Sequence, residues 1–535
     1  IRELHSSIAY PIKEYGSHVV SGLDPSGGRS VTSLLLLVRV FAHSMGFLVA
    51  VSVVVGVVYL LNLLLRHLSL RSKLSSLPSA RSLPVIGHGA LVKPDPEGFV
   101  DQVMGMSAIY NSPRICLFWL GPKPTLMIYS AELVEKVMNS GYHLNKGFVY
   151  DLLHPWLGLS LLTTDKEEWR PRRKMLTPTF HYDILKDFIP IFNEHAKVLV
   201  EKMDALKEGE PMDVLKLISL CTLDAICETS MGKMVNAQQC EDSEYVRAVH
   251  DINEIVQNRA KNPLVWPAFT FSMTTEGKRH DECLRILHGF TRKVMEERTE
   301  ELTKREWRLE GRLAFLDLLL HMWKEGSMDW DDIQPEVDTF MFEGHDTTST
   351  ALTWTLHLIG NNPHVQERVQ KEVDEVFDRG ELQVEDIGKL KYLEACIKEA
   401  LRIFPSVPII MRQLGRDEEL AGCVVPKGTH ILLNLYLVHR DPLQWKDPET
   451  FNPDRFFSED TSKRHPFAFV PFSAGSRNCI GQRFALIEEK TILAWIFRKF
   501  TIKSVEKRFE VRTKMELIMR PQGDVHVALT PRRRV

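Results

Sequence analysis

A single cysteine lies between two glycines in the stretch FSAGSRNCIG, residues 472–481 of this 535-residue chain. The glycines permit backbone conformations that bring the chain close to a flat partner. Arg477 supplies a cation two residues before Cys479, and the next segment, QRFALIEEKTILAWIFRKF, has helical periodicity. The N-terminal dipole of that helix favours a thiolate at Cys479. A buried structural cysteine is the alternative, but the spacing F-x-x-G-x-R-x-C-x-G favours a thiolate presented to a planar ligand.

Residues 45–65, MGFLVAVSVVVGVVYLLNLLL, form an uncharged apolar run. As a helix this run would span about 31 Å, enough to cross the hydrocarbon core of a membrane. A buried core helix and a cleaved signal peptide are the alternatives. However, the run is longer than a typical signal-peptide core, and no clear small-residue cleavage site follows it. The sequence therefore predicts a transmembrane anchor at 45–65, preceded by a segment, 1–44, to which no function is assigned.

Basic residues and prolines follow the apolar run. Arg66, Arg71, Lys73 and Arg81 place the remainder of the chain in the cytosol by the positive-inside rule. The two prolines of SLPSARSLPVIGHGAL make a stiff, non-helical connector. Residues 66–84 are therefore predicted to be a hinge between the anchor and the globular part.

The composition excludes several classes of protein. A net charge of -3 gives no overall field for a nucleic-acid partner. The eight cysteines show no C-x-x-C spacing, which argues against a disulfide framework and against a zinc site. We expect free thiols in a reducing compartment.

Most of the chain beyond residue 85 has helical periodicity. The clearest helical segments lie around 131–140, 184–206, 212–231, 244–260, 281–303, 363–377 and 389–404. The segment RICLFWLGPKPTLMIYS predicts a β-hairpin, and short strands are expected around 408–433 and after 510. No second linker and no internal repeat is evident, so one large domain, mainly α with a small β region, is predicted for 85–535.

A long helix is predicted over 331–360, and its middle is unusually polar. Residues 343–348, EGHDTT, interrupt the apolar run with a glycine, charged groups and threonines. Threonine hydroxyls bend helices by bonding to local carbonyl groups, and a bent polar patch in an apolar helix often marks a cavity. A polar stripe that faces water remains the alternative.

The helix KYLEACIKEALRI stops before Pro405 and places Glu399 and Arg402 on one face. Taken alone, this pair is more simply an ordinary surface ion pair.

In their order along the chain, these motifs resemble those of the haem-thiolate monooxygenases, the cytochrome P450 family. The resemblance covers about residues 80–530. It includes the E-x-x-R pair, FNPDRF at 451–456, the cysteine loop, and a W-x-x-x-R element from Trp169 to Arg173. The segment EVDTFMFEGHDTT resembles the signature of family 4, and WLGLSLLTT, RRKMLTPTFH and PFSAGSRNCIGQ are similar to its V subfamily. The implied fold is the cytochrome P450 fold, and the implied cofactor is haem b.

The resemblance implies a role for each matching residue. Cys479 would be the axial ligand of the haem iron. The haem propionates would be held by Trp169, Arg173, Arg412 and Arg477. A buried ionic cluster behind the haem would consist of Glu399, Arg402 and Arg455.

The middle of the long helix would lie over the distal face of the haem. Asp346 and Thr347 would deliver protons to bound oxygen, and Gly344 would leave space for that oxygen. Glu343 is the family 4 peculiarity, because members with this glutamate form an ester to a haem methyl group.

The resemblance also implies an activity, partners and a location. The chain would hydroxylate fatty acids at or near the omega carbon with O2. Electrons would come from NADPH through a separate NADPH-cytochrome P450 reductase, with cytochrome b5 as a further partner. The protein would lie in the endoplasmic reticulum membrane with a cytosolic catalytic domain. The basic run Arg170, Arg172, Arg173 and Lys174 is either a solvated helix face or part of a docking surface for an acidic flavoprotein.

Two other functions remain open. One is an isomerase or dehydratase on the same scaffold, which would act on peroxides and would not need the Asp346–Thr347 pair. The other is a haem protein without enzymatic activity, acting as a sensor or carrier.

Overall fold

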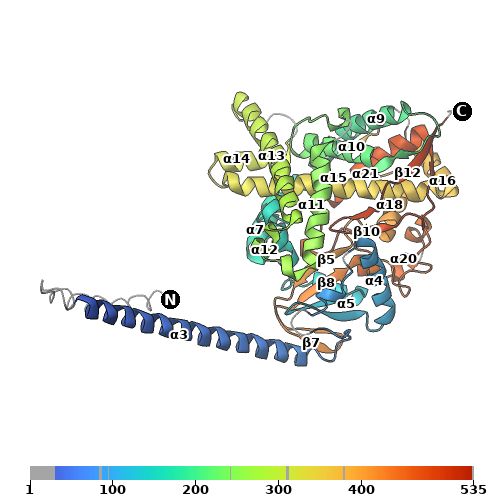
Figure 1. Cartoon of the computed structure of the whole chain (residues 1–535). Coiled ribbons are helices and arrows are strands. Elements are labelled where there is room, and N and C mark those ends of the chain that lie inside the picture. Colours follow the sequence, from blue (N-terminus) through green and yellow to red (C-terminus); the bar gives the residue numbers. More distant parts are fainter. Residues whose placement is uncertain are drawn as a thin grey trace. The chain divides into compact units, whose positions relative to one another are not determined.

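The structure is a computed structural model that describes residues 30–83, 87–93, 95–240, 243–308, 313–377, 380–458 and 460–532. Residues 1–29 of the unassigned segment and Pro84 of the predicted hinge lie outside the described residues. The chain divides into two compact units, Ile1–Lys73 and Leu74–Val535. Figure 1 shows the long helix of the first unit and the globular second unit.

The first unit contains one long helix, α3 (Ser30–Lys73). Within it, Phe47–Lys73 is long and apolar enough to cross a membrane, and none of the most apolar window is buried. The helix begins earlier than the predicted anchor and continues through Arg66, Arg71 and Lys73. These basic residues, expected in the hinge, therefore belong to the last turns of the helix, and the connector begins after Lys73.

The second unit is mainly helical. Its longer helices are α4 (Pro96–Ile109), α5 (Ala131–Met138), α7 (Lys166–Leu176), α9 (Ile189–Asp204), α10 (Val214–Ser230), α11 (Glu244–Lys261), α13 (Thr275–Lys304), α14 (Phe315–Lys324), α15 (Trp330–Gly360), α16 (Pro363–Val376), α18 (Lys391–Ile403) and α21 (Gln482–Lys499). Short helices α6 (His154–Leu157) and α12 (Ala268–Ser272) lie between them.

The β region is small and divided among four sheets. The largest has the strand order β1 (Ile115–Leu120), β2 (Lys123–Ile128), β8 (His430–Asn434), β5 (Ile409–Gln413) and β3 (Asn145–Lys146). Only β2 and β8 pair in parallel in this sheet. The others are β4 (Met212–Asp213) with β12 (His526–Pro531) and β9 (Phe500–Ser504), β10 (Thr513–Met515) with β11 (Met519–Pro521), and β6 (Glu418–Leu420) with β7 (Cys423–Val425).

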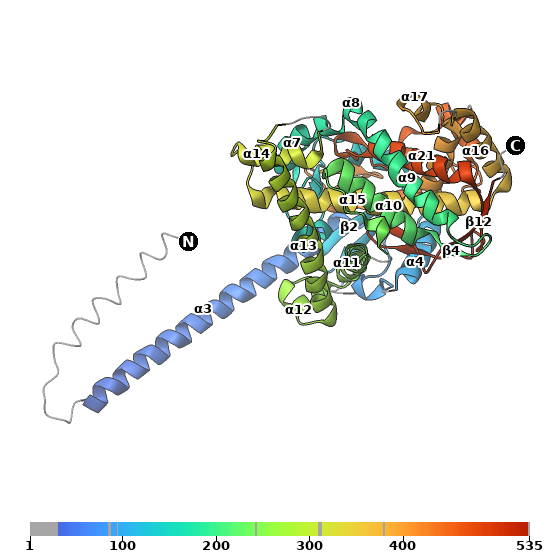
Figure 2. The same ribbon diagram turned by 90° about the horizontal axis from the view of Figure 1, so that it is seen from above.

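Helix α15 is the centre of the globular part and crosses it from one side to the other (Figures 1 and 2). Its first turn carries Asp331 and Asp332, which complement the positive end of the helix dipole. Beyond that turn most of its residues are buried, since α10, α13, α18 and β9 pack around it. A helix covered on all sides can place side chains in more than one internal site.

The predicted fold class, mainly α with a small β region, is confirmed. The predicted helices correspond to α5, α9, α10, α11, α13, α15, α16, α18 and α21, and the predicted hairpin is β1–β2. Helix α18 ends at Ile403, two residues before Pro405, because the residue that precedes a proline disfavours helical conformation.

The pair Glu399 and Arg402 is fully buried and not on the surface. Arg402 donates to both carboxylate oxygens of Glu399, from Nε at 2.8 Å and from Nη2 at 2.9 Å. Arg455 Nε donates to Glu399 Oε1 at 2.9 Å, and Arg402 Nη1 donates to the carbonyl oxygen of His439 at 2.9 Å. This three-residue ionic cluster joins α18 to the segment that precedes the cysteine loop.

Candidate functional site

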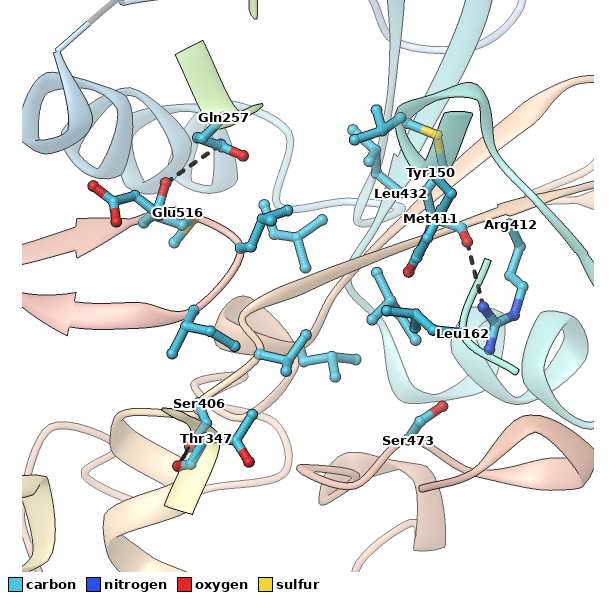
Figure 3. Close-up of a pocket in the computed structure, with 18 of the residues that line it drawn as sticks. Tyr150, Leu162, Gln257, Thr347, Ser406, Met411, Arg412, Leu432, Ser473 and Glu516 are labelled. Atoms are coloured by element: carbon cyan, nitrogen blue, oxygen red, sulfur yellow. Dashed lines mark hydrogen bonds between the residues drawn. The ribbon is translucent and has the colours of Figure 1, made fainter. Parts of the chain in front are cut away.

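A cavity of about 550 Å³ lies within the globular part and brings distant segments together. The middle of α15, the cysteine loop, α7 and β5 line one end, whereas α4, the last turns of α11 and the β10–β11 hairpin line the other. In Figure 3, Arg412 and Tyr150 lie on one side of the cavity, and Gln257 and Glu516 lie on the other.

Cys479 faces this cavity from the loop between η9 (Gly475–Arg477) and α21. The backbone N–H of Cys479 donates to the carbonyl oxygen of Phe472 at 2.9 Å, which closes the loop. Gly475 has a φ of +68°, and a Cβ at this position would lie 2.1 Å from the carbonyl oxygen of Met138. Glycine is therefore required at 475 both by the backbone conformation and by the close contact with α5.

The Cys479 thiol is enclosed by protein although it is exposed to the cavity. Burial raises its pKa to about 12, and the charge of Glu343 adds to the rise. The N–H groups of Gly481 and Gln482 and the cation of Arg173 lower the pKa but do not outweigh burial. The N-terminus of α21 lowers the pKa of Cys479, as expected, but this effect alone does not produce a thiolate. A metal cation bound at the sulfur would produce one.

Helix α7 positions the cysteine loop. Arg173 donates from Nη1 to the carbonyl oxygen of Asn478 at 2.7 Å and from Nη2 to Asn478 Oδ1 at 2.9 Å. Trp169 is buried, and the guanidinium carbon of Arg477 lies 4.8 Å from the centre of its ring. Arg173 therefore holds Asn478, the residue next to Cys479. The sequence predicted only that Arg173 would contact a haem propionate.

A cluster of buried cations lies at the same end of the cavity. Arg477 donates to the carbonyl oxygen of Thr164, but its Nε and Nη1 have no hydrogen-bond partner among the described residues. Arg412 is 3% exposed and interacts with the hydroxyl of Tyr150. The ammonium group of Lys146 lies 4.1 Å from the centre of the Tyr150 ring. We call Lys146, Arg412 and Arg477 the cation cluster.

The members of the cation cluster repel one another. Burial and the charge of Arg412 lower the pKa of Arg477 to about 9. Burial, with the charges of both arginines, lowers the pKa of Lys146 well below its ordinary value. Buried cations need anionic partners, and guanidinium groups bind carboxylates best. The two propionates of haem match this requirement, and Cys479 offers a ligand for iron, so the cavity residues fit the haem that the sequence implies.

Glu343 and Thr347 are polar residues of α15 that line the cavity. The pKa of Glu343 is about 7, because burial raises it and the charge of Lys146 only partly offsets that rise. The hydroxyl of Thr347 lines the cavity and donates to the carbonyl oxygen of Glu343 at 2.6 Å. Ser406 donates to the carbonyl oxygen of Thr347 at 2.9 Å.

Asp346 does not line the cavity. Its Oδ2 accepts from Arg520 on β11 and from Asn253 Nδ2 on α11, the latter at 3.4 Å. Burial would raise the pKa of Asp346, but the charge and hydrogen bond of Arg520 lower it below its ordinary value. The structure thus brings Thr347 to the cavity and places Asp346 on another face of the helix.

Gly344 lines the cavity but also has a packing role. A Cβ at this position would lie 2.5 Å from Cδ1 of Ile226 on α10. The glycine therefore allows α10 and α15 to approach each other. This packing requires glycine at 344 independently of the expected space for oxygen.

The basic run of α7 is divided between interior and surface. Arg172 donates to Glu336 at 2.9 Å and to Asp332 at 3.2 Å, which links α7 to α15. Arg173 holds the cysteine loop, whereas Arg170 and Lys174 are exposed. Only these two exposed residues remain available for a docking surface.

Sequence reasoning did not identify Lys146, Tyr150 or Arg520. Lys146 and Tyr150 belong to the short segment NKGFVYD, which has no spacing signal of its own, and Arg520 is separated from Asp346 by most of the C-terminal third. For Lys146 and Arg520, the available signal was a single cation within a mainly uncharged stretch of sequence.

Comparison with known proteins gives consistent matches. The family model "Cytochrome P450" matches residues 77–528. Cytochrome P450 4V2 of Homo sapiens is 47% identical over 467 residues, which covers 85% of this chain and 89% of that protein. Cytochrome P450 4V2 of Mus musculus is 46% identical, covering 86% and 90%. Cytochrome P450 4c3 of Drosophila melanogaster is 41% identical, covering 86% and 90%.

Proposed function

The chain belongs to the cytochrome P450 family and is a haem-thiolate monooxygenase of family 4, and from this premise we propose that it hydroxylates fatty acids at or near the terminal methyl group. Haem bound through a cysteine thiolate supplies oxygen activation, because the thiolate favours cleavage of the O–O bond. The cavity residues hold the haem, bind the substrate and deliver protons.

The apolar lining of the cavity carries the proposal of a fatty acid substrate. Between the cation cluster and α4, the walls include Leu120, Leu153, Phe340, Phe342, Leu432 and Ile518. Such walls bind an alkyl chain by removing its surface from water, at about 25 cal/mol for each Å². They offer few polar partners to a substrate with many hydroxyl groups.

The proposal includes electron supply and location. Electrons would pass from NADPH through a separate reductase, with cytochrome b5 as a second donor and the exposed Arg170 and Lys174 as part of the docking surface. Helix α3, which is long and apolar enough to cross a membrane, supports attachment to the endoplasmic reticulum.

The direct test is turnover of the full chain with reductase, NADPH and a panel of free fatty acids. We expect one oxygen atom in the product, located by mass spectrometry at the terminal carbon or its neighbour. Hydroxylation mainly at internal carbons would contradict the proposal. Conversion of lipid hydroperoxides without NADPH would instead support an isomerase or dehydratase, and the absence of substrate-dependent NADPH consumption would support a carrier.

We also propose that Glu343 forms an ester with a methyl carbon of haem. Glu343 faces the cavity and is enclosed by protein, where an ionised carboxylate is costly. Formation of the C–O bond of the ester would break one C–H bond of the methyl group and release two electrons, with one proton from the C–H bond and a second from Glu343 if its carboxyl group is protonated; the oxygen chemistry of the enzyme is the oxidant. A protonated or water-bonded acid is the alternative.

The ester is tested by denaturing the protein after turnover and extracting it with acidified organic solvent. Haem should remain with the wild type and leave Glu343→Ala. Complete release of haem from the wild type after many turnovers would exclude the ester.

A further inference from the structure

Met411 on β5 lines the cavity beside the cation cluster, and its side chain lies directly against Gly147. A Cβ at position 147 would lie 3.2 Å from Cβ of Met411 and would overlap its Cγ and Sδ. Contacts between nonbonded carbon atoms are ordinarily about 3.5–4.0 Å, so the thioether fills the space that a side chain at 147 would need. The backbone of Gly147 is extended, with a φ of -85°, so the close contact alone requires glycine here.

The backbone around Gly147 is held on both sides of the glycine. Before it, Lys146 of β3 pairs with β5, and the N–H of Lys146 donates to Asp165 Oδ1 at 2.8 Å. After it, the N–H of Tyr150 donates to the carbonyl oxygen of Gly147 at 2.9 Å. A methyl group added at 147 therefore meets a backbone that is fixed and an unbranched, flexible side chain, so the side chain of Met411 is the part that moves.

The space open to a displaced Met411 side chain is the cavity. Only 3% of Met411 is exposed, and its cross-strand neighbour on β8 is Leu432, which lines the same cavity. Figure 3 shows Met411 beside Leu432 and Tyr150 in one wall. Because the interior around this wall is close-packed, a thioether pushed away from Gly147 enters the cavity and narrows it.

We propose that Gly147 and Met411 form one specificity determinant, in which the glycine gives the methionine a place in the wall and the pair sets the width of the cavity beside the cation cluster. The inference rests on the proposed function, because it concerns the shape of the site for that same fatty acid substrate. A pocket discriminates between ligands by whether its walls leave room for each group. A narrow wall admits a straight alkyl chain, excludes a bulky end and limits how far the chain bends towards the reacting centre.

The test is a double-mutant cycle with two ligands of similar length, dodecanoic acid and 8-phenyloctanoic acid, which ends in a rigid ring. Affinities are measured in the haem-loaded full chain by the spectral shift of the ferric enzyme, independently of turnover. Gly147→Ala should weaken binding of the ring-ended acid relative to dodecanoic acid by about tenfold or more, the effect of one obstructing group in a pocket. In the Met411→Ala background, the same change should alter this affinity ratio less than about threefold, because no thioether is left to displace.

Met411→Ala by itself should widen the cavity. The ring-ended acid should then bind more tightly relative to dodecanoic acid, and oxidation of dodecanoic acid should shift towards internal carbons. Gly289→Ala on α13 is a matched control, since a Cβ at 289 would meet nothing within 4 Å and this position does not line the cavity. The control should change neither the affinity ratio nor the position of oxidation.

Equal effects of Gly147→Ala on the affinity ratio with and without the Met411 side chain would overturn the inference while the proposed function stands. If the wild type binds both acids but hydroxylates neither, the proposed function fails and the affinity ratios still test the pair. Should Gly147→Ala retain too little haem for measurement, the double variant should retain it, because the group that would be displaced is absent. Loss of haem from the double variant as well would show that the backbone, and not Met411, requires glycine at 147, and would overturn the inference.

Discussion

At the scale of single residues, Cys479 shows how strongly a site can depend on its cofactor. Its thiol has a pKa of about 12 in the protein alone, so the iron has to displace a proton when it binds. Cys479→Ala should therefore abolish turnover and the thiolate signature of the ferrous carbon monoxide spectrum. A variant that kept this signature would show that another residue is the ligand.

Asp338 on α15 carries a second prediction at this scale. Burial raises its pKa from 3.8 to about 8, although Thr291 donates to it at 2.6 Å. Between these pH values the unfolded chain ionises while the folded protein stays protonated, so the stabilisation present below pH 3.8 is lost as pH rises towards 8.

Asp338→Asn removes this dependence and keeps a hydrogen-bond acceptor for Thr291. The wild type loses stability over this range and the variant does not. The free energy of unfolding of Asp338→Asn minus that of the wild type should therefore increase by a few kcal/mol from about pH 4 to about pH 8. Thermal unfolding at several pH values measures the difference, and a constant gap between the two proteins would contradict the raised pKa.

At the scale of elements, α15 places neighbouring residues in separate environments. Consecutive residues of a helix lie about 100° apart, so Thr347 can face the cavity while Asp346 faces α11 and β11. If Thr347 takes part in proton delivery, Thr347→Ala should consume NADPH at a similar rate but release more peroxide, because it removes a hydroxyl that lines the cavity.

Asp346→Asn tests the other face of the helix. It weakens the contact with Arg520, so we expect uncoupling together with lower thermal stability. The ratio of product to NADPH consumed checks both variants. Unchanged coupling in both would remove these residues from proton delivery.

The geometry of a helix also explains what the sequence could and could not predict about the site. Periodicity identified α15 and α18, and the fixed spacing around Cys479 identified the loop, because both signals are local. The partners Arg520 of Asp346 and Lys146 of Glu343 are distant in sequence and depend on tertiary packing. Local spacing therefore identified the candidate residues but did not determine which face of a helix each of them uses or what it contacts.

The ionic cluster of α18 supports a prediction about stability. Removing one member leaves an uncompensated buried charge, so Arg402→Leu should lower the free energy of unfolding by about 3–5 kcal/mol and reduce haem retention. Arg368→Ala is a matched control, since its pair with Asp454 is about half exposed on both sides, with side-chain exposures of 51% and 53%. It should cost less than about 1 kcal/mol.

Denaturant unfolding, followed by loss of the haem absorption band, measures both variants. If Arg402→Leu and Arg368→Ala lost equal free energies of unfolding, the buried cluster would contribute no more to stability than an exposed ion pair.

At the scale of the whole molecule, the chain separates at Lys73 into a long apolar helix and a globular unit. A protein that begins at residue 74 should bind haem and be more soluble than the full chain, because the candidate span Phe47–Lys73 is gone. The full chain should resist alkaline carbonate extraction from membranes. Complete extraction would contradict a spanning helix, whereas a truncated protein that remained in the pellet would only show that the globular unit also binds lipid.

The contacts of Asp346 join α15 to two other parts of the globular unit. Arg520 belongs to the hairpin that lines the far end of the cavity, and Asn253 belongs to α11, whose last turns line the same end. A substrate that shifts either element changes the free energy of the Asp346 contacts, and by thermodynamic reciprocity those contacts change substrate affinity. We therefore expect allosteric coupling between the cavity and Asp346: binding of a substrate in the cavity should change the equilibrium between the bonded and the released Asp346 carboxylate. The pKa of the Asp346 carboxylate should then depend on which substrate is bound.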